Sequence, residues 1–130
     1  MSTNIVKLTS VIIVDDDNTL VKVFEQYLKL NNINVLGQCY DGKEAVTLYE
    51  KLKPDVVLLD VMMPYHDGFY ALEKIKEIDP DAKVIAVTAD LTADTEKKLQ
   101  NLKVSGIIYK PYHMHDILNT IENVNNQTIM

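Results

Sequence analysis

The stretch VVLLD at residues 56–60 decides the fold, because four apolar residues run straight into a carboxylate. Three further apolar runs also end in a polar residue: residues 11–14 before Asp15, residues 84–87 before Thr88, and residues 107–109 before Lys110. In an open parallel sheet, ligands bind beyond the carboxyl ends of the strands. We therefore expect these four runs to be buried strands whose polar ends meet at one site.

Strand-like and helix-like runs alternate along the chain, which favours βα units and a parallel sheet. A weaker strand is expected at residues 33–38. Helical spacing, capping residues and proline stops predict five helices, at about residues 17–30, 42–53, 68–78 and 93–103 and after residue 111. Right-handed crossovers place these helices on both faces of the sheet. The predicted fold class is α/β, with a doubly wound, five-stranded parallel sheet.

Length and composition bound the class of protein. A chain of 130 residues suits one domain, with a core at about residues 9–124 and a frayed tail over residues 125–130. The net charge of -6 argues against a protein that binds nucleic acid directly. The single cysteine, Cys39, has no partner for an internal disulfide and is expected to be a small buried apolar residue. No secretory or membrane-spanning pattern is present, so a cytoplasmic location is the default expectation.

The acidic strand ends predict a metal site with phosphoryl chemistry. Carboxylates that meet at one site repel each other unless they are protonated or a cation neutralises them. Oxygen ligands without Cys or His suit Mg²⁺, with Mn²⁺ as an alternative. A carboxylate beside such an ion can attack phosphorus, while the Lys110 ammonium neutralises phosphoryl oxygens and the Thr88 hydroxyl donates a hydrogen bond to them.

Four motifs together resemble the receiver domains of two-component response regulators. They are VIIVDDD at residues 11–17, LLDVMMPYHDG at 58–68, VTA at 87–89 and YKP at 109–111. Each motif is weak by itself, but their order and spacing are similar to this family along nearly the whole chain. The resemblance is to a stand-alone, chemotaxis-regulator-like receiver, and it implies a flavodoxin-like sheet with the strand order 2-1-3-4-5.

The resemblance also implies roles for the strand-end residues. Asp60 is expected to be the phosphoacceptor, Thr88 the switch hydroxyl and Lys110 the phosphate-binding ammonium. Mg²⁺ would be held by Asp16, Asp60 and the backbone carbonyl of Met62, with Asp15 acting largely through water. A cis peptide bond is expected before Pro111.

Two positions are expected to influence the lifetime of the phosphoryl group. Met62 lies two residues after the phosphoacceptor and would shield the site, whereas Asp90 lies two residues after Thr88 and could orient the hydrolytic water. The expected switch region comprises Thr88, Ile107, Tyr109 and Pro111. Many receivers have an aromatic residue where this chain has Ile107, so whether Tyr109 replaces that aromatic switch is left open.

The leading functional prediction is a signalling switch that accepts a phosphoryl group from a partner phosphohistidine. The expected partners are a histidine kinase or a histidine phosphotransfer protein and an unidentified downstream protein, with no membrane contact. The chain is expected to be a monomer or a phosphorylation-dependent dimer. About one helix fits after Pro111, so no attached output domain is expected. Its only expected catalysis is phosphoryl transfer to Asp60 and the loss of that group.

Three other interpretations compete with this one. Residues 15–19 fit the DxDxT pattern of haloacid-dehalogenase-type phosphatases, in which Asp15 would be the nucleophile. That enzyme class needs a further acidic motif after the lysine and would leave Asp60 without a role. An interaction module that works without phosphorylation has no support in the sequence, since every expected catalytic position is filled. A flavodoxin-like electron carrier is weaker still, because three aspartates would repel a flavin phosphate.

Overall fold

The computed structural model describes residues 7–63 and 67–126, in which five strands alternate with five helices. The elements are β1 Ser10–Val14, α1 Asn18–Leu30, β2 Asn34–Cys39, α2 Gly42–Leu52, β3 Val56–Asp60, α3 Gly68–Ile78, β4 Val84–Thr88, α4 Ala93–Asn101, β5 Gly106–Tyr109 and α5 Met114–Asn126. The strands form one parallel sheet in the order β2-β1-β3-β4-β5. This topology confirms the predicted fold class and strand order.

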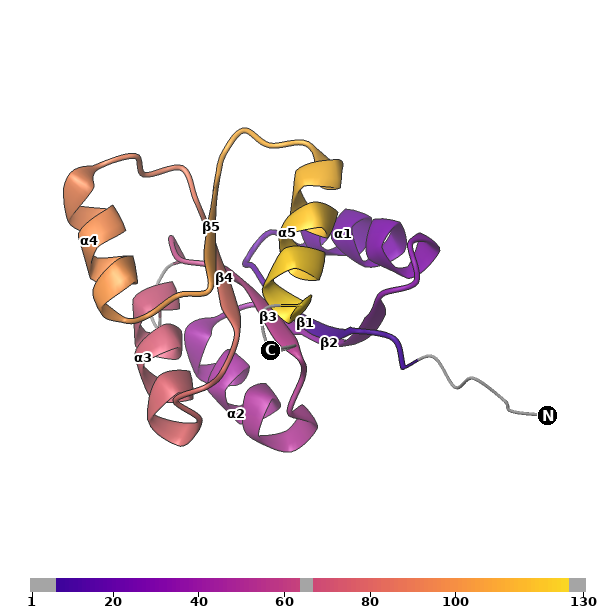
Figure 1. Ribbon diagram of the computed structural model, residues 1–130, viewed down its shortest axis with the longest axis horizontal. Coiled ribbons are helices and arrows are strands. Elements are labelled where there is room, and N and C mark those ends of the chain that lie inside the picture. The colour runs from indigo at the N-terminus through magenta and orange to yellow at the C-terminus, as the bar shows by residue number, and fades with distance from the viewer. Residues whose placement is uncertain (1–6, 64–66, 127–130) are drawn as a thin grey trace.

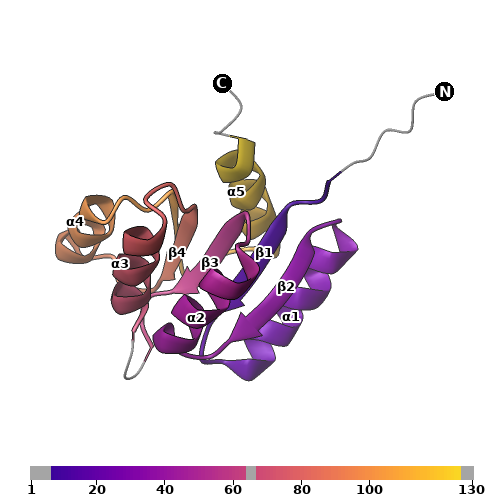
Figure 2. The same cartoon turned by 90° about the horizontal axis from the view of Figure 1, so that it is seen from below.

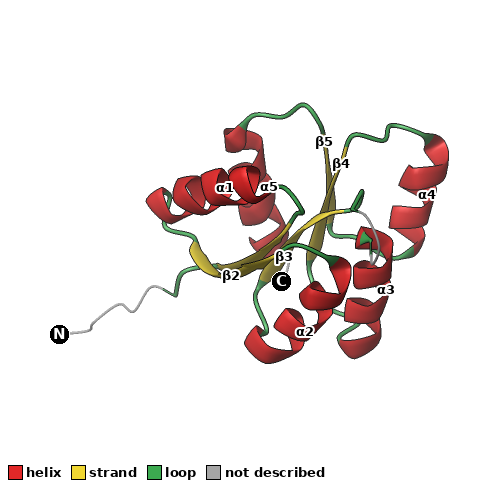
Figure 3. Ribbon diagram, turned by 180° about the vertical axis from the view of Figure 1, so that it is seen from behind, coloured by secondary structure: helices red, strands yellow, loops and turns green. Residues whose placement is uncertain are grey.

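The helices cover both faces of the sheet. Helices α1 and α5 lie on one face, and α2, α3 and α4 lie on the other (Figures 1 and 3). Seen from below, α2 and α3 lie against the central strands while α5 lies behind the sheet (Figure 2). The three central strands are therefore buried on both sides, which explains why their sequences are continuous apolar runs without alternation.

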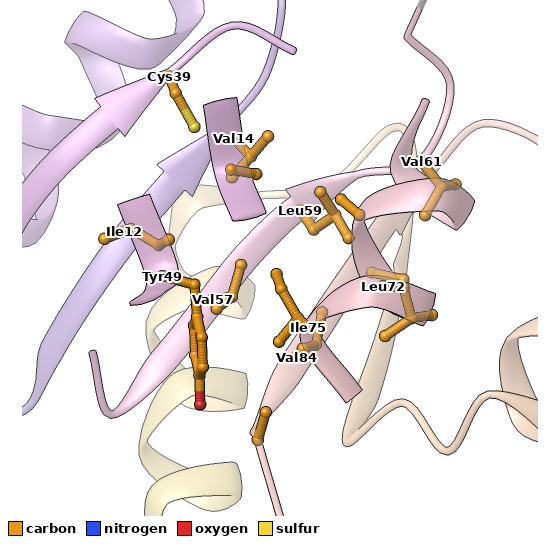
Figure 4. Close-up of a cluster of buried hydrophobic side chains, with 14 of the residues drawn as sticks. Ile12, Val14, Cys39, Tyr49, Val57, Leu59, Val61, Leu72, Ile75 and Val84 are labelled. Carbon is orange, nitrogen blue, oxygen red and sulfur yellow. The ribbon is translucent and has the colours of Figure 1, made fainter. Parts of the chain in front are cut away.

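Side chains of β1 show how the two layers of the core are built. Val11 and Ile13 pack in the cluster that α1 and α5 cover, whereas Ile12 and Val14 pack in the cluster that α2 and α3 cover. Figure 4 shows part of the second cluster, where side chains from β1, β3 and α3 point toward one another. All four of these β1 residues are at most 1% exposed, so the strand that leads into the acidic site is held firmly.

Pairing between strands brings the polar strand ends to one edge of the sheet. Asp60 at the end of β3 pairs with Val87 of β4, and Thr88 pairs with Tyr109 of β5. Three helices then begin directly beyond this edge, each capped by an aspartate side chain that accepts a backbone hydrogen bond: Asp17 for α1, Asp41 for α2 and Asp67 for α3. These caps fix where α1, α2 and α3 begin relative to the carboxyl edge of the sheet.

The structure extends the last helix further than the sequence predicted. Helix α5 continues to Asn126, two residues into the segment that was expected to be a frayed tail. The side-chain amide of Asn125 donates to Thr9 Oγ1 at 3.0 Å, and Lys83 Nζ donates to the carbonyl of Asn125 at 3.0 Å. These contacts tie the end of the helix to the start of β1 and to the loop before β4. The remainder of the expected tail lies outside the described residues.

Smaller differences concern weak elements. Strand β2 covers Asn34–Cys39, one residue later than expected. It is an edge strand that mixes polar and apolar residues, so no continuous apolar run marks where it begins and ends. Helix α4 ends at Asn101, about two residues before its expected end. Cys39 is buried as predicted, and burial is the main reason that its pKa is raised to about 12. Within the described ranges, every helix is too short or too polar to cross a lipid bilayer.

Candidate functional site

Three carboxylates converge at the carboxyl edge of the sheet, as the sequence predicted. One oxygen each from Asp15, Asp16 and Asp60 lies within 4.8 Å of the other two. Asp15 and Asp60 are each only 4% exposed, whereas Asp16 faces solvent. The cluster therefore has two buried members, Asp60 at the end of β3 and Asp15 directly after β1, and one accessible member, Asp16, which follows Asp15.

Backbone amides hold the two buried carboxylates in place. The amide of Asp17 donates to Asp15 Oδ1 at 2.9 Å, and the amide of Met62 donates to Asp60 Oδ1 at 3.0 Å. Each carboxylate is thus oriented by the residue two positions further along its own chain segment. The Asp17 side chain instead caps α1, where its Oδ1 atom accepts a hydrogen bond from the amide of Leu20 at 3.1 Å.

Burial raises the free-energy cost of ionising Asp15 and Asp60. The pKa of Asp15 is raised from 3.8 to about 6, first by burial and further by the negative charge of Asp60, although the Asp17 amide partly offsets this. The pKa of Asp60 is also raised, again mainly by burial, with Asp16 adding to the effect and Lys110 opposing it. A cation bound among these oxygens would remove the repulsion.

The donor set fits a hard divalent cation. It consists of carboxylate oxygens, without a thiolate or imidazole in the cluster, and Mg²⁺ and Mn²⁺ prefer such ligands. The exposed Asp16 leaves one side of the cluster open to solvent, as a site that also admits phosphoryl oxygens requires.

Lys110 and Thr88 complete the edge on the side of β4 and β5. Lys110 Nζ lies 3.8 Å from Asp60 Oδ2, and the Lys110 amide donates to the carbonyl of Thr88 at 2.9 Å. Thr88 is fully buried at the end of β4. The structure therefore brings the carboxylates and the ammonium together, and it places Thr88 at the end of the neighbouring strand, where the Lys110 amide bonds to its carbonyl.

The remaining predicted positions surround this centre. Met62 is 56% exposed, and its amide bonds to Asp60 Oδ1. The carboxylate of Asp90 is taken up by hydrogen bonds from Thr92 and Thr95, at 2.9 and 2.6 Å. Ile107 and Tyr109 are half-buried on β5, and a cis peptide bond precedes Pro111 as predicted. Residues 64–66 of the LLDVMMPYHDG motif lie outside the described residues.

Tyr112 is a neighbour of the site that the sequence did not reveal. Its ring stacks on Phe24 of α1, with ring centroids 5.8 Å apart and an interplanar angle of 18°. Burial raises the pKa of Tyr112 to about 12, and the charges of Asp15 and Asp60 contribute next. The only sequence signal for this placement is that Tyr112 follows the Lys110–Pro111 turn, because the stacking partner is 88 residues away along the chain.

Gly68 is a second residue whose role emerges from packing. A Cβ atom at this position would lie 2.3 Å from Val61 Cα and 2.6 Å from the carbonyl oxygen of Asp60. Such distances leave no room for a side chain, so the start of α3 presses directly on the backbone that carries Asp60. The Gly68 amide also donates to the carbonyl of Val61 at 3.3 Å, which fixes this contact.

Comparison with known proteins places the chain in a family. Residues 11–122 match the family described as the response regulator receiver domain. CcdB of Bacillus subtilis is 33% identical over 117 residues, which cover 90% of this chain and 98% of that protein. The chemotaxis protein CheY of Listeria monocytogenes is 33% identical over 119 residues, covering 88% of this chain and 97% of that protein.

Solved structures agree with these sequence matches. A LuxR-family DNA-binding response regulator from Staphylococcus aureus superposes with a TM-score of 0.86 at 32% identity, over 92% of this chain and 100% of that chain. A chain of the CheX–CheY–BeF3–Mg²⁺ complex from Borrelia burgdorferi superposes with a TM-score of 0.84 at 31% identity, over 89% of this chain and 88% of that chain.

Proposed function

Because the chain belongs to the family of response regulator receiver domains of two-component signalling, we propose that it is a switch activated by phosphorylation of Asp60. The observation that carries this proposal is the position of Asp60, which is buried among other carboxylates with Lys110 Nζ 3.8 Å from its Oδ2 atom. The donor is a phosphohistidine of a histidine kinase or a histidine phosphotransfer protein.

In the proposed transfer, Asp60 Oδ2 attacks the phosphorus of the phosphohistidine. A P–O bond to the carboxylate forms while the P–N bond breaks, and the partner's imidazole leaves with the electron pair and takes up a proton. Oδ1 stays bound to the Met62 amide, so the carboxylate keeps one orientation during the attack. Lys110 is placed to neutralise charge on the transferred phosphoryl oxygens, and it also favours the reactive anionic form of Asp60.

The carboxylates are the proposed ligands of the metal ion. Asp16, Asp60 and the carbonyl of Met62 would hold Mg²⁺ or Mn²⁺, and Asp15 would act largely through bound water. When bound, the ion supplies positive charge that offsets the carboxylates and the phosphoryl oxygens. The raised pKa values of Asp15 and Asp60 support this assignment, because burial raises both although Lys110 opposes the shift, and a bound cation would favour the ionised carboxylates further.

Residues around the centre are proposed to set the response and its duration. The buried Thr88 hydroxyl would donate a hydrogen bond to the phosphoryl group, and Ile107, Tyr109 and Pro111 would transmit the change along β5. Met62 would shield the phosphoryl group from water. The output would be contact with a downstream protein, made by the monomer or by a phosphorylation-dependent dimer, without direct contact to nucleic acid.

The proposal is tested by intact mass after incubation with Mg²⁺ and acetyl phosphate. Wild-type protein should gain one phosphoryl group, and Asp60→Asn should gain none. Asp41→Asn is the matched control, because Asp41 caps α2 away from the cluster and should still allow labelling. Chelation of the metal by EDTA should abolish labelling of every variant.

One outcome would replace the proposal with the phosphatase interpretation. If the label survives Asp60→Asn and is lost in Asp15→Asn, the first carboxylate of the DDD run is the nucleophile. Lys110→Ala separates transfer from response: it should retain some labelling while losing the conformational change that follows.

A further inference from the structure

The loop between β4 and α4 contains a hydrogen-bonded connection that none of the predicted roles uses. Thr95, in the first turn of α4, donates its hydroxyl to Asp90 Oδ2 at 2.6 Å, and the amide of Thr92 donates to Asp90 Oδ1 at 2.9 Å. Thr95 is only 9% exposed although it lies on a polar helix. Each oxygen of the Asp90 carboxylate therefore accepts a hydrogen bond from a residue at the start of α4.

The backbone of the same aspartate reaches the phosphorylation site. The amide of Asp90 donates to Thr88 Oγ1 at 3.0 Å. Thr88 is fully buried on β4, next to the strand that ends in Asp60. A continuous series of hydrogen bonds thus runs from the Thr88 hydroxyl through Asp90 to Thr95.

We propose that Thr95 is a positioning residue that holds Thr88 in its resting position through Asp90, and thereby opposes phosphorylation of Asp60. The inference rests on the proposed function, because it concerns how Thr88 reaches a phosphoryl group on Asp60. When the Thr88 hydroxyl moves toward a phosphoryl group on Asp60, it moves away from the Asp90 amide. The backbone of Asp90 cannot move with it, because the Asp90 carboxylate is bonded to Thr92 and Thr95. The hydrogen bond between the Asp90 amide and Thr88 Oγ1 therefore breaks.

Thermodynamic linkage gives the direction of the effect. An interaction that favours the resting state must weaken binding of any ligand that favours the phosphorylated state, and its removal must strengthen that binding. A typical intramolecular hydrogen bond shifts such an equilibrium by about three- to tenfold. The low pKa of Asp90, which is due first to the bond from Thr95, is consistent with a bond to the ionised carboxylate.

Thr95→Val removes the donor hydroxyl while keeping the shape of the side chain. Helix α4 keeps its own cap in this variant, because the amide of residue 95 still donates to Thr92 Oγ1, at 3.3 Å in the wild-type protein. Thr95→Ser restores the hydroxyl and is the rescue variant. Thr47→Val is the matched control, since the Thr47 hydroxyl donates to the carbonyl of Lys43 within α2, away from the β4–α4 loop.

The test is isothermal titration calorimetry, which measures the affinity of the full chain for beryllofluoride in the presence of Mg²⁺. Thr95→Val should bind about three- to tenfold more tightly than wild type, and Thr95→Ser and Thr47→Val should bind like wild type. Equal or weaker binding by Thr95→Val would overturn the inference and leave the proposed function intact. Wild-type protein that fails to bind beryllofluoride would overturn both.

Hydrogen exchange of wild-type protein provides a readout that does not depend on a variant's folding. The Asp90 amide should be protected in the resting protein and should lose protection when beryllofluoride saturates the site. Protection that is unchanged by saturation would show that the Asp90–Thr88 bond persists, and the inference would be rejected.

Discussion

Replacing Asp15 with asparagine should stabilise the metal-free protein, although it damages the site. Asp15 is buried beside Asp60, and its pKa is raised from 3.8 to about 6. Each pKa unit corresponds to about 1.4 kcal/mol, so the ionised carboxylate costs the folded state up to about 3 kcal/mol. Asparagine keeps an oxygen that accepts from the Asp17 amide, at 2.9 Å in wild type, but carries no charge. The expected gain in the free energy of unfolding is about 2–3 kcal/mol.

The stability advantage of Asp15→Asn over wild type should increase as the pH rises. Because the folded protein binds the Asp15 proton more tightly than the unfolded chain does, wild-type stability falls as the pH rises from 3.8 to about 6. The full cost is present above that window and absent below it. Asp15→Asn should therefore be more stable than wild type at about pH 8 and equal to it below about pH 4.

Urea unfolding without divalent cations measures this difference directly. Asp41→Asn controls for the substitution itself, because Asp41 caps α2 outside the cluster and asparagine is an equally good cap. Mg²⁺ should narrow the gap at about pH 8, since wild type gains more from the ion than the variant does. An Asp15→Asn protein that is no more stable than wild type at that pH, or that keeps its advantage below about pH 4, would refute the argument.

Three further substitutions test the packing around the site by urea unfolding. Gly68→Ala should cost about 1–3 kcal/mol, because the new Cβ would overlap the backbone of residues 60 and 61. Gly37→Ala is the control: its Cβ would meet only the ends of the Leu48 and Leu52 side chains, at 3.3 and 3.4 Å, so stability should change by less than about 0.5 kcal/mol. Equal costs for the two would contradict this. Tyr49→Phe removes the bond that links α2 to Asp79 and should cost about 1–2 kcal/mol; no loss would mean that the 2.8 Å contact contributes nothing. Asn125→Ala should cost about 1 kcal/mol, and an unchanged midpoint would indicate that the end of α5 is not held by Thr9.

The acidic centre was predictable because its information is local in the sequence. Asp15, Asp60, Thr88 and Lys110 each terminate an apolar run, and parallel strands place such ends at one edge of the sheet. The prediction needed no knowledge of distances, only the strand type and the direction of the chain. The same logic explains why the edge strand β2, which has no continuous apolar run, was placed one residue early.

The residues that sequence analysis missed act through contacts across the fold. Tyr112 stacks on Phe24 of α1, and no periodicity relates the two positions. Gly68 looks like an ordinary turn glycine until the distance of its missing Cβ from Val61 is known. The helical end at Asn125 likewise depends on Thr9, at the opposite end of the chain. Such pairings follow from packing geometry, which a single sequence does not encode in any short pattern.

Asp90 shows how the structure changes the chemical interpretation of a residue that the sequence did find. Its position two residues after Thr88 suggested that its carboxylate could orient a hydrolytic water. Both carboxylate oxygens accept hydrogen bonds from the start of α4, so a water that Asp90 orients would share this carboxylate with Thr92 and Thr95. Loss of the phosphoryl group and movement of α4 would then be coupled through one carboxylate. A variant that frees Asp90, such as Thr95→Val, should change both together.

The two sides of the site therefore differ in how firmly they are held. Asp15 and Asp60 lie at the ends of strands that are buried on both faces, and backbone amides of Asp17 and Met62 hold their carboxylates in place. Thr88 is equally buried, but the loop beyond it is held by a few partly exposed hydrogen bonds. Bonds of this kind open at low cost compared with a packed core. Under the proposed function, the rigid ends of β1 and β3 would hold a phosphoryl group on Asp60. The loop after Thr88 would change conformation in response, so the two parts of the switch lie on different sides of the site.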